Sequence, residues 1–337
     1  MRCWRSRWLV LLIAAVSLLP GCGLYRAGCP AGMEVLADGL TNPRGLVRGP
    51  DGALYLAEAG DDATGGRITR VGPDGAHTVL AAGLPHSVNA GVEDVGTADV
   101  AFRRGELYAV EAEAEGELAS SLYRLDAGGP TKVADLLAYE RRANPDGAGV
   151  ESNPFALRYE IDEDRFYATD GAGNDLLRIA PDGAVEAVAA WRDDPVPTGF
   201  TRGTDRALYV ALFGKFPHDP GGGRVDRVGT DGAVTTVVDH LTMPVGVAFG
   251  GDVLYVLEFA AGLDLQPRLQ FRPSSGRLLR VAGGRREVIV DRLRYPTALV
   301  PDPNGGFLVA DGGAMVGAGR GRVVRVSACD VPIGGEK

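Results

Sequence analysis

The chain has 337 residues, of which 35 are basic and 44 are acidic, giving a formal net charge of −9. It contains no run of lysine or arginine that could form the basic stripe of a nucleic-acid-binding surface, so the composition argues against nucleic acid as a partner. A hydrophobic content of 45% together with 49 glycines indicates a folded chain rich in tight turns rather than a disordered one.

Residues 1–21 have the pattern of an export signal. Three arginines precede the apolar run from Trp8 to Leu19, which is shorter than the roughly 20 residues that a membrane-spanning helix needs. Pro20 and Gly21 then lead into Cys22, and this ending resembles the lipobox of bacterial lipoproteins, in which the cysteine is acylated after cleavage. We therefore expect an exported protein that is attached to the membrane only through a lipid on Cys22, with ordinary secretion as the alternative.

From residue 42 onward, one pattern of four short apolar runs separated by turns such as Pro-Asp-Gly recurs six times. The second run of each copy ends at Glu58, Glu111, Asp170, Leu212, Glu258 or Asp311, and the third carries Arg70, Arg124, Arg178, Arg227, Arg280 or Arg325. Repeats of four short strands are the signature of a β-propeller, in which each sheet buries its faces against its neighbours. We predict an all-β, six-bladed β-propeller with four antiparallel strands per blade, and a structural role for the repeated arginines, through packing or ion pairing inside each blade.

The last repeat shows only three strands, whereas a spare strand, Met33–Leu40, precedes the first repeat. Its sequence MEVLADGL matches the fourth strand of the first repeat, HTVLAAGL, so we expect it to complete the sixth blade. The predicted organisation is a signal peptide at residues 1–21, a linker at 22–32, the propeller at 33–329 and a tail at 330–337. A closed ring of this kind is expected to be a monomer.

Two cysteines flank this predicted closure. Cys29 precedes the incoming strand, and Cys329 falls where other blades place the tight turn between their third and fourth strands. A disulfide between them would replace the missing turn, and loss of chain entropy in the unfolded state would make it worth roughly 5 kcal/mol. Export into an oxidising compartment favours the disulfide, and two free thiols are the alternative.

The connections between strands predict two unlike faces. Turns between the first and second strands and between the third and fourth are uniformly tight; we call this side the turn face. The other connections carry nearly all the insertions, at residues 85–97, 112–121, 141–153, 213–223 and 259–276, and we call that side the loop-bearing face. Variable loops on a rigid scaffold are a common way to present a binding surface. We expect the loop-bearing face to bind a protein, a glycan or a small molecule.

Candidate ligands gather on the loop-bearing face. Five carboxylates end second strands there, namely Glu58, Glu111, Asp170, Glu258 and Asp311, and Asn42 and Asn153 enter first strands. These are hard oxygen donors suited to Ca²⁺ or another divalent cation, or to a polar ligand. The competing interpretation is that a residue repeated in most blades caps nearby backbone N–H groups.

His86 and His218 lie in insertions, where a histidine can bind a ligand or act as a base. The sequence contains no G-x-S-x-G, H-E-x-x-H, P-loop or C-x-x-C motif. No catalytic residue is therefore assigned from sequence, and whether the protein is an enzyme stays open.

Several segments resemble the ScyD/ScyE family, which is related to NHL-type six-bladed propellers. They include NPRGLVRGPDGALYLAEAG, YATDGAGNDLLRI and MPVGVAFGGDVLYVLE, and the likeness extends over roughly residues 33–326. The most specific match is the F-P-x-x-P-G pattern at Phe216, Pro217, Pro220 and Gly221, with His218 in its variable middle. The resemblance implies an exported six-bladed propeller but assigns it no chemistry.

A second resemblance is to gluconolactonase-like propellers, which bind a divalent cation at the mouth of the channel. Asn153 and Asp170 match that pattern, whereas Asn42 stands near the position where that family has a glutamate. The leading hypothesis is thus a lipid-anchored binding propeller. The alternatives are a metal-dependent lactonase or hydrolase, with Glu58, Glu111, Asn153 and Asp170 as ligands, and a quinone-dependent sugar dehydrogenase with His86 or His218 as the base.

Overall fold

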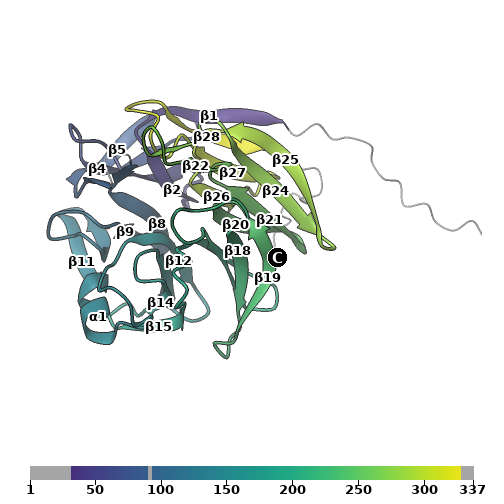
Figure 1. Ribbon diagram of the computed structural model, residues 1–337. Coiled ribbons are helices and arrows are strands. Elements are labelled where there is room, and N and C mark those ends of the chain that lie inside the picture. The colour runs from purple at the N-terminus through teal and green to yellow at the C-terminus, as the bar shows by residue number, and fades with distance from the viewer. Residues whose placement is uncertain (1–31, 90–92, 328–337) are drawn as a thin grey trace, which may run out of the picture. The chain divides into compact units, whose positions relative to one another are not determined.

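The computed structural model describes residues 32–89 and 93–327, and these form six four-stranded antiparallel sheets arranged as a propeller (Figure 1). Blade 1 contains β2 (Pro43–Arg48), β3 (Leu54–Glu58), β4 (Gly66–Val71) and β5 (His77–Leu84); blade 2 contains β8 (Thr97–Arg103), β9 (Glu106–Glu111), β10 (Ser121–Asp126) and β11 (Gly129–Asp135); and blade 3 contains β12 (Pro154–Glu160), β13 (Arg165–Asp170), β14 (Asp175–Ile179) and β15 (Val185–Ala190). The predicted all-β fold is confirmed.

The remaining three blades repeat the same order. Blade 4 contains β16 (Pro197–Arg202), β17 (Leu208–Leu212), β18 (Gly223–Val228) and β19 (Val234–Leu241); blade 5 contains β20 (Pro244–Gly250), β21 (Val253–Glu258), β24 (Gly276–Ala282) and β25 (Arg285–Leu293); and blade 6 contains β26 (Ala298–Pro301), β27 (Phe307–Asp311), β28 (Gly321–Val326) and β1 (Met33–Leu40). No helix among the described residues is long and apolar enough to cross a membrane.

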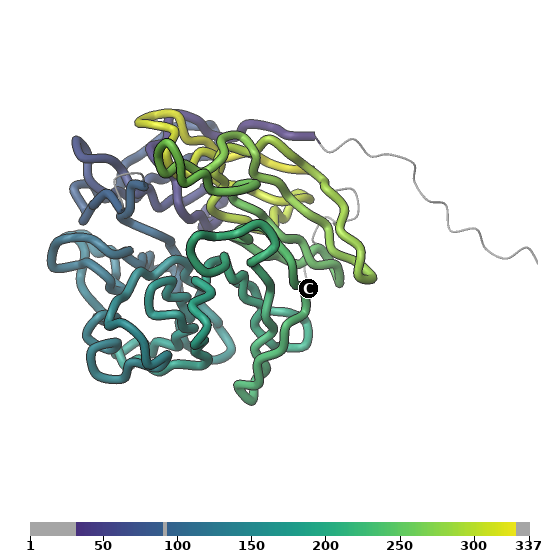
Figure 2. The backbone as a smooth tube through the Cα atoms, viewed as in Figure 1, coloured from purple at the N-terminus to yellow at the C-terminus, as the bar shows by residue number. Residues whose placement is uncertain are grey.

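The sixth blade is completed by the strand that comes first in the chain. β1 pairs antiparallel with β28, with Met33 opposite Val326 and Leu40 opposite Gly321. In Figure 2 the purple N-terminal strand accordingly runs beside the yellow end of the chain. The predicted closure by Met33–Leu40 is confirmed. Cys22, Cys29 and Cys329 lie outside the described residues, so the lipid anchor and the disulfide stay predictions.

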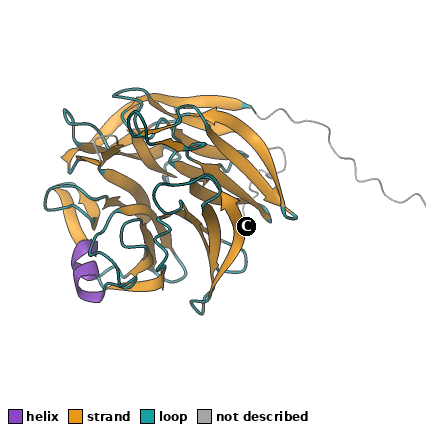
Figure 3. Cartoon of the chain, in the orientation of Figure 1, coloured by secondary structure: helices purple, strands orange, loops and turns teal. Residues whose placement is uncertain are grey.

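Three insertions carry secondary structure that the strand pattern did not predict. β6 (Ser87–Asn89) pairs with β7 (Glu93–Val95), and β22 (Leu263–Asp264) pairs with β23 (Gln270–Phe271). The helix α1 (Leu136–Ala143) follows β11 and is the purple element of Figure 3. The Asp135 side chain caps it by accepting a hydrogen bond from the Ala138 N–H at 2.8 Å.

Aromatic side chains connect neighbouring blades in a repeated way. The second-strand tyrosine of one blade packs against a phenylalanine of the next, as in Tyr55 with Phe102 at 4.8 Å between ring centroids and Tyr209 with Phe249 at 4.9 Å. Further pairs of this kind are Tyr108 with Phe166 and Tyr255 with Phe307. Edge-to-face and tilted pairs at such distances are favourable beyond the area they bury, and they fix how each blade sits on its neighbour.

The centre of the ring is tightly packed. A space of only about 20 Å³, lined among others by Gly45, Asp99 and Gly199, remains between the innermost strands. Gly45 allows this approach, because a Cβ atom there would lie 2.1 Å from Asp99 Oδ1 and 2.7 Å from the Ala98 carbonyl oxygen. The axial channel is therefore closed to ligands below its mouth.

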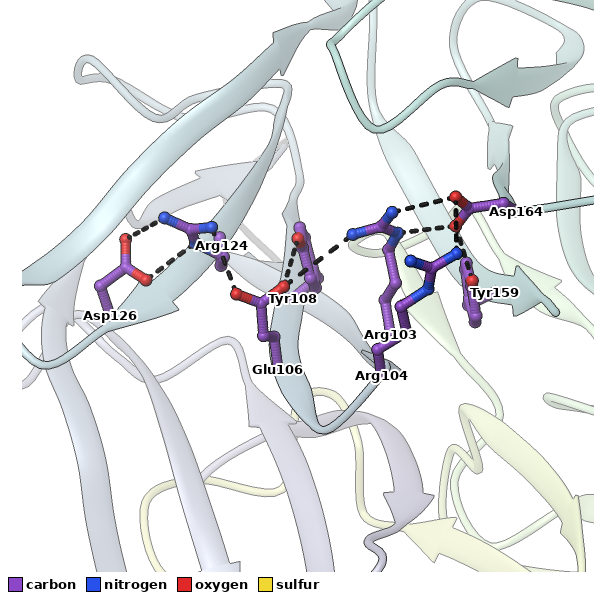
Figure 4. A network of polar contacts seen from close by, with 8 residues as sticks. All are labelled: Arg103, Arg104, Glu106, Tyr108, Arg124, Asp126, Tyr159 and Asp164. Carbon is purple, nitrogen blue, oxygen red and sulfur yellow. Dashed lines mark hydrogen bonds and ion pairs between the residues drawn. The ribbon is translucent and has the colours of Figure 1, made fainter.

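Ion pairs connect side chains on the turn face. Figure 4 shows Arg103, at the end of β8, and Arg104, in the turn that follows, directed at Asp164 of blade 3. Arg124 bridges Glu106 and Asp126. The repeated third-strand arginines pair within their own blades, as in Arg70–Asp51, Arg178–Glu186, Arg227–Asp205 and Arg325–Asp302. Of the two roles expected for the repeated arginines, ion pairing is found for these four and for Arg124.

Candidate functional site

The carboxylates that end the second strands each join the strands of their own blade. Glu58 is fully buried and accepts hydrogen bonds from the Thr41 N–H at 2.5 Å and from the Arg67 guanidinium at 2.7 and 2.8 Å. We call the five carboxylates that end second strands the rim carboxylates; they are Glu58, Glu111, Asp170, Glu258 and Asp311. Glu258 repeats the arrangement with the Thr242 N–H and Arg277, and Asp311 repeats it with the Arg294 N–H and Arg322. In blades 1, 5 and 6, the rim carboxylate therefore fixes the backbone that leads into the first strand.

The rim carboxylates of blades 2 and 3 lack the arginine. Glu111 accepts hydrogen bonds from the hydroxyls of Thr97 (3.2 Å) and Tyr123 (3.3 Å), and burial raises its pKa well above the usual range. Asp170 accepts from the N–H groups of Asn153 (2.7 Å) and Gly173 (3.0 Å) and from the Ser152 hydroxyl (2.5 Å). Burial raises the Asp170 pKa, opposed by these hydrogen bonds.

These contacts bear on whether the predicted residues fit a metal at the channel mouth. The rim carboxylates come from separate blades, and no three Asp, Glu, His or Cys side chains of residues 32–89 and 93–327 are grouped as metal ligands. The side-chain oxygen of Asn153 accepts a hydrogen bond from the Glu113 N–H at 3.2 Å. Glu58, Glu111 and Asp170 each end the second strand of a different blade, so the lactonase-like ligand set is not brought together around one point in this arrangement.

A cavity opens instead at the mouth of the channel on the loop-bearing face. It has a volume of about 540 Å³ and is lined by residues from the loops of blades 1 to 5 and from the first strands. Its lining includes the predicted residues Asn153 and His218 but neither His86, Asn42 nor any rim carboxylate. We call it the mouth cavity. Its size is within the usual range for small-molecule sites.

Aromatic side chains form one wall of the mouth cavity. Phe213, Phe259 and Phe271 are buried in that wall, while Phe216 is 58% exposed. His218 stands among them, with its ring 4.9 Å from Phe213 and nearly parallel to Phe271 at 6.2 Å. Two long insertions, from blades 4 and 5, therefore meet to build this wall.

The His218 ring is held in one tautomer. Its Nδ1 lies 2.6 Å from the carbonyl oxygen of Gly214, and because a carbonyl only accepts, Nδ1 carries the proton and donates. Burial lowers the pKa of His218, which favours the neutral ring. Nε2 is then left as an acceptor, and an acceptor nitrogen oriented in this way can bind a donor or remove a proton.

Acidic groups lie around the opening of the mouth cavity. Its lining contains the carboxylates Glu93, Glu113, Glu151 and Asp194, and a single cationic side chain, Arg44. Arg44 is already paired with Glu93 at 2.6 Å and lies over the Phe155 ring at 5.6 Å. The opening therefore carries an excess of negative charge.

His86 and Asn42 belong to a separate cluster beside the mouth cavity. His86 Nε2 lies 3.0 Å from Asp94 Oδ1, and Asn42 Nδ2 donates to the other oxygen of Asp94 at 2.9 Å. Asn42 also donates to the Gly60 carbonyl oxygen at 2.9 Å. These contacts tie the β6–β7 hairpin to the start of blade 1.

The sequence analysis did not predict the aromatic and acidic residues that line the mouth cavity. Glu93, Glu113, Glu151 and Asp194 occupy no repeated position, because each belongs to a different insertion. A weaker signal was available: the insertions at residues 213–223 and 259–276 contain Phe213, Phe216, Phe259 and Phe271 in a chain of only 7% aromatic residues.

The fold is similar to solved six-bladed propellers. Virginiamycin B lyase from Staphylococcus aureus is 16% identical with a TM-score of 0.54, the alignment covering 84% of this chain and 80% of the other. The quinone-bound aldose sugar dehydrogenase from Streptomyces coelicolor is 17% identical with a TM-score of 0.58, and the alignment covers 88% of this chain and 98% of the other. The gluconolactonase from Xanthomonas campestris is 15% identical with a TM-score of 0.53, and the alignment covers 88% of this chain and 90% of the other. No family model and no curated protein sequence matches the chain. At these identities the likeness shows the fold alone.

Proposed function

We propose that this chain is an exported, lipid-anchored propeller of the ScyD/ScyE type that binds a small organic cation in the mouth cavity. The observation that carries the proposal is the mismatch between acceptors and donors in the cavity lining. Carboxylates and the His218 Nε2 supply many acceptors, and almost every side-chain donor is already used. A ligand that donates hydrogen bonds and carries positive charge complements such a lining.

The donors of the lining are committed as follows. The Arg44 guanidinium is paired with Glu93. The Thr198 hydroxyl lies 2.9 Å from the Pro244 carbonyl oxygen, and the Thr297 hydroxyl donates to the Pro43 carbonyl oxygen at 2.7 Å. Side-chain amides of Asn89 and Asn153 remain as neutral donors. An anionic ligand would find no free cationic side chain in this lining.

The aromatic wall supports a cation with an apolar body. Phenylalanine rings attract a positively charged group through their negative faces, by roughly 0.5–2 kcal/mol according to how dry the site is. The buried rings of Phe213, Phe259 and Phe271 can pack against an apolar body, while Glu113, Glu151 and Asp194 at the opening face its ammonium or guanidinium group. The expected ligand is thus amphipathic.

The same charge balance tests the sugar dehydrogenase alternative. Pyrroloquinoline quinone carries three carboxylates, so a site for it needs several cationic groups. The mouth cavity offers Arg44, which is already paired, against four carboxylates. The lining does not fit this cofactor, and we propose no step through it.

A second candidate function is proton abstraction from the bound ligand by His218. The hydrogen bond from Nδ1 to the Gly214 carbonyl oxygen favours it, because it leaves Nε2 free to accept a proton. Among the similar structures, virginiamycin B lyase was solved as a catalytically inactive histidine-to-alanine variant. Chemical conversion of a bound ligand by the wild type, lost in His218→Gln while binding persists, would establish this role.

Binding is tested with ligands that share one body and differ in charge. We expect 2-phenylethylammonium to bind at least tenfold more tightly than 2-phenylethanol and 3-phenylpropionate in calorimetric titrations of the purified protein. Asp194→Asn should weaken binding of the ammonium ligand only, because it removes a negative charge from the lining. Phe213→Ala should weaken binding of all three ligands, because it removes part of the aromatic wall. Equal binding of all three would refute the cation preference, and no binding would refute the site.

The anchor is tested separately. Metabolic labelling with a fatty acid should mark the wild type and should fail to mark Cys22→Ala. A wild type that takes up no label would leave a secreted protein and remove this part of the proposal.

A further inference from the structure

The rim carboxylates face different partners in different blades. In strand register, Glu58 is opposite Arg67, Glu258 opposite Arg277 and Asp311 opposite Arg322. In blade 4 the same position is Arg224, opposite Leu212. Blade 3 departs from this pattern, because Asp170 is opposite Asp175. At the one place where four blades put an arginine, blade 3 has a second carboxylate.

Asp175 is deeply buried and has no partner. It is 1% exposed, and neither of its carboxylate oxygens has a hydrogen-bond partner. The charges that act on it are those of Asp170, Glu140 and Asp146, all negative, and with burial they raise its pKa well above the usual range. Glu140 is 2% exposed, and its Oε1 is also without a partner. None of these four side chains forms an ion pair with any described residue.

Hydrogen bonds from the protein satisfy only part of this cluster. Asp146 accepts hydrogen bonds from the Ala148 N–H at 2.8 Å and from Asn174 Nδ2 at 3.2 Å, and Asp170 accepts three more. Both oxygens of Asp175 and the Oε1 of Glu140 are left without a donor. Buried charges without a counter-charge are costly, which favours the presence of a cation.

We infer that blade 3 binds a calcium ion between Asp175, Glu140 and Asp146, in place of the arginine that the other blades supply from their own chain. The donors are all oxygen, with no histidine or cysteine among them, which is the chemistry that Ca²⁺ prefers. Two of the three come from the connection between blades 2 and 3: Glu140 from α1 and Asp146 from the loop that follows it. The arginine is thus missing in the blade into which this acidic connection leads.

Binding would be accompanied by a local closure. As the side chains stand, no three carboxylates of the described chain surround a common point. Binding would therefore require Glu140 and Asp146 to turn towards Asp175. Asn174 Nδ2, which bonds Asp146, also lies 3.5 Å from Asp194 Oδ1 at the mouth cavity. The proposed ion is distinct from the cavity ligand and would stiffen the wall behind it.

The test uses the full chain, freed of metal with a chelator and studied at about pH 7.5. We expect calorimetry to show one Ca²⁺ bound per chain and thermal unfolding to shift upward by several degrees on adding Ca²⁺. Asp175→Asn should lose the shift and at least tenfold in Ca²⁺ affinity, yet unfold at a higher temperature than the metal-free wild type, because it removes one repelling charge. A role in packing alone would not give these opposite signs.

Two further variants make the test specific. Glu111→Gln changes a buried rim carboxylate of blade 2 that also has an unpartnered oxygen, and it should leave the Ca²⁺ response intact. Asp175→Arg returns the arginine of the other blades and should make the protein insensitive to both Ca²⁺ and chelator. A wild type that binds no Ca²⁺, or a Glu111→Gln variant that loses the response, would overturn the inference. Neither outcome depends on what binds in the mouth cavity.

Discussion

Carboxylate and arginine side chains pair at both ends of the blades, but in different surroundings. At the loop-bearing end, the side chain of Glu58 is completely buried and that of its partner Arg67 is 21% exposed. At the turn face, Arg70 and Asp51 are 31% and 39% exposed. The buried carboxylate also holds a backbone N–H, whereas the exposed pair lies across a tight turn. The buried pair determines the path of the chain. The exposed pair contacts a turn whose conformation is already defined by the backbone of that turn.

The largest effect is expected from breaking a buried pair. Arg67→Ala leaves the Glu58 carboxylate buried without its counter-charge, which should cost roughly 3 kcal/mol of unfolding free energy, measured by urea denaturation. Glu58→Gln combined with Arg67→Ala should recover part of this loss, because the orphaned charge is then gone. If the single and double variants are equally unstable, the charge is not the cause.

The next effect concerns the blade that lacks the arginine. Burial, with Asp146 and Asp170 nearby, raises the pKa of Glu140 to about 7 from an ordinary value of 4.5. Between these two values the unfolded chain releases a proton that the folded chain keeps, so metal-free protein should lose stability as the pH rises from about 4.5 to 7. Unfolding curves across this range should show the decline, and Glu140→Gln should flatten it.

Other groups titrate in the same range and must be separated from Glu140. Burial raises the pKa of Asp99 to about 6 as well, so Glu140→Gln should reduce the slope rather than abolish it. Added Ca²⁺ should also flatten the profile, since a bound ion favours the ionised carboxylates. An unchanged slope in Glu140→Gln would show that this carboxyl group does not carry the effect.

A smaller effect is expected where the turn face joins two blades. Arg103 of blade 2 forms paired hydrogen bonds with Asp164 of blade 3 at 2.8 and 3.0 Å, and these hold the pKa of Asp164 well below its usual range (Figure 4). Arg103→Ala should lower the urea midpoint several-fold less than Arg67→Ala does. The loss should shrink as the pH falls below about 4, where Asp164 of the unfolded chain becomes protonated, and should vanish only below the lowered pKa of Asp164 in the wild type; a loss that does not shrink would implicate packing instead.

The smallest effect is expected at the exposed pairs. Arg70→Ala should shift the urea midpoint only slightly, and the shift should vanish in about 1 M NaCl, where charges are screened within a few ångströms. Arg67→Ala should keep most of its cost in the same salt, because its partner is buried. Equal salt sensitivity of the two variants would remove the distinction between the two ends of the blade.

The sequence was sufficient for the fold because the fold is a repeat. Turn residues and apolar runs occur in six copies, so the interpretation of each copy is supported by the other five. The spare strand Met33–Leu40 can be assigned because only the sixth blade lacks a fourth strand. The helix α1 was not predicted because it occurs once, within an insertion, and is flanked by segments with strand patterns. Its cap at Asp135 is a local signal, but one such residue cannot be told from the many aspartates in turns.

The site was predictable only in part. Asn153 and His218 lie in the mouth cavity as lining residues, but its carboxylates depend on how five insertions fold over one another, which no repeated position encodes. The blade 3 cluster is different. Aligning the third strands on their repeated arginine, Arg178 in blade 3, would have placed Asp175 against Arg67, Arg277 and Arg322, so the change in charge was visible in the sequence. Its burial and its lack of partners were not.

Ring closure by β1 has a consequence for the order of events during synthesis. Among the strands of residues 32–89 and 93–327, the one made first, β1, pairs with β28, the last to leave the ribosome. Until then blade 6 lacks its partner, and an emerging chain holds up to five blades with an open edge at each end. Such edges can pair with other chains, and the contact that removes them spans almost the whole sequence, which makes it slow to form. The period of greatest risk of aggregation is therefore the interval before residues 321–326 appear.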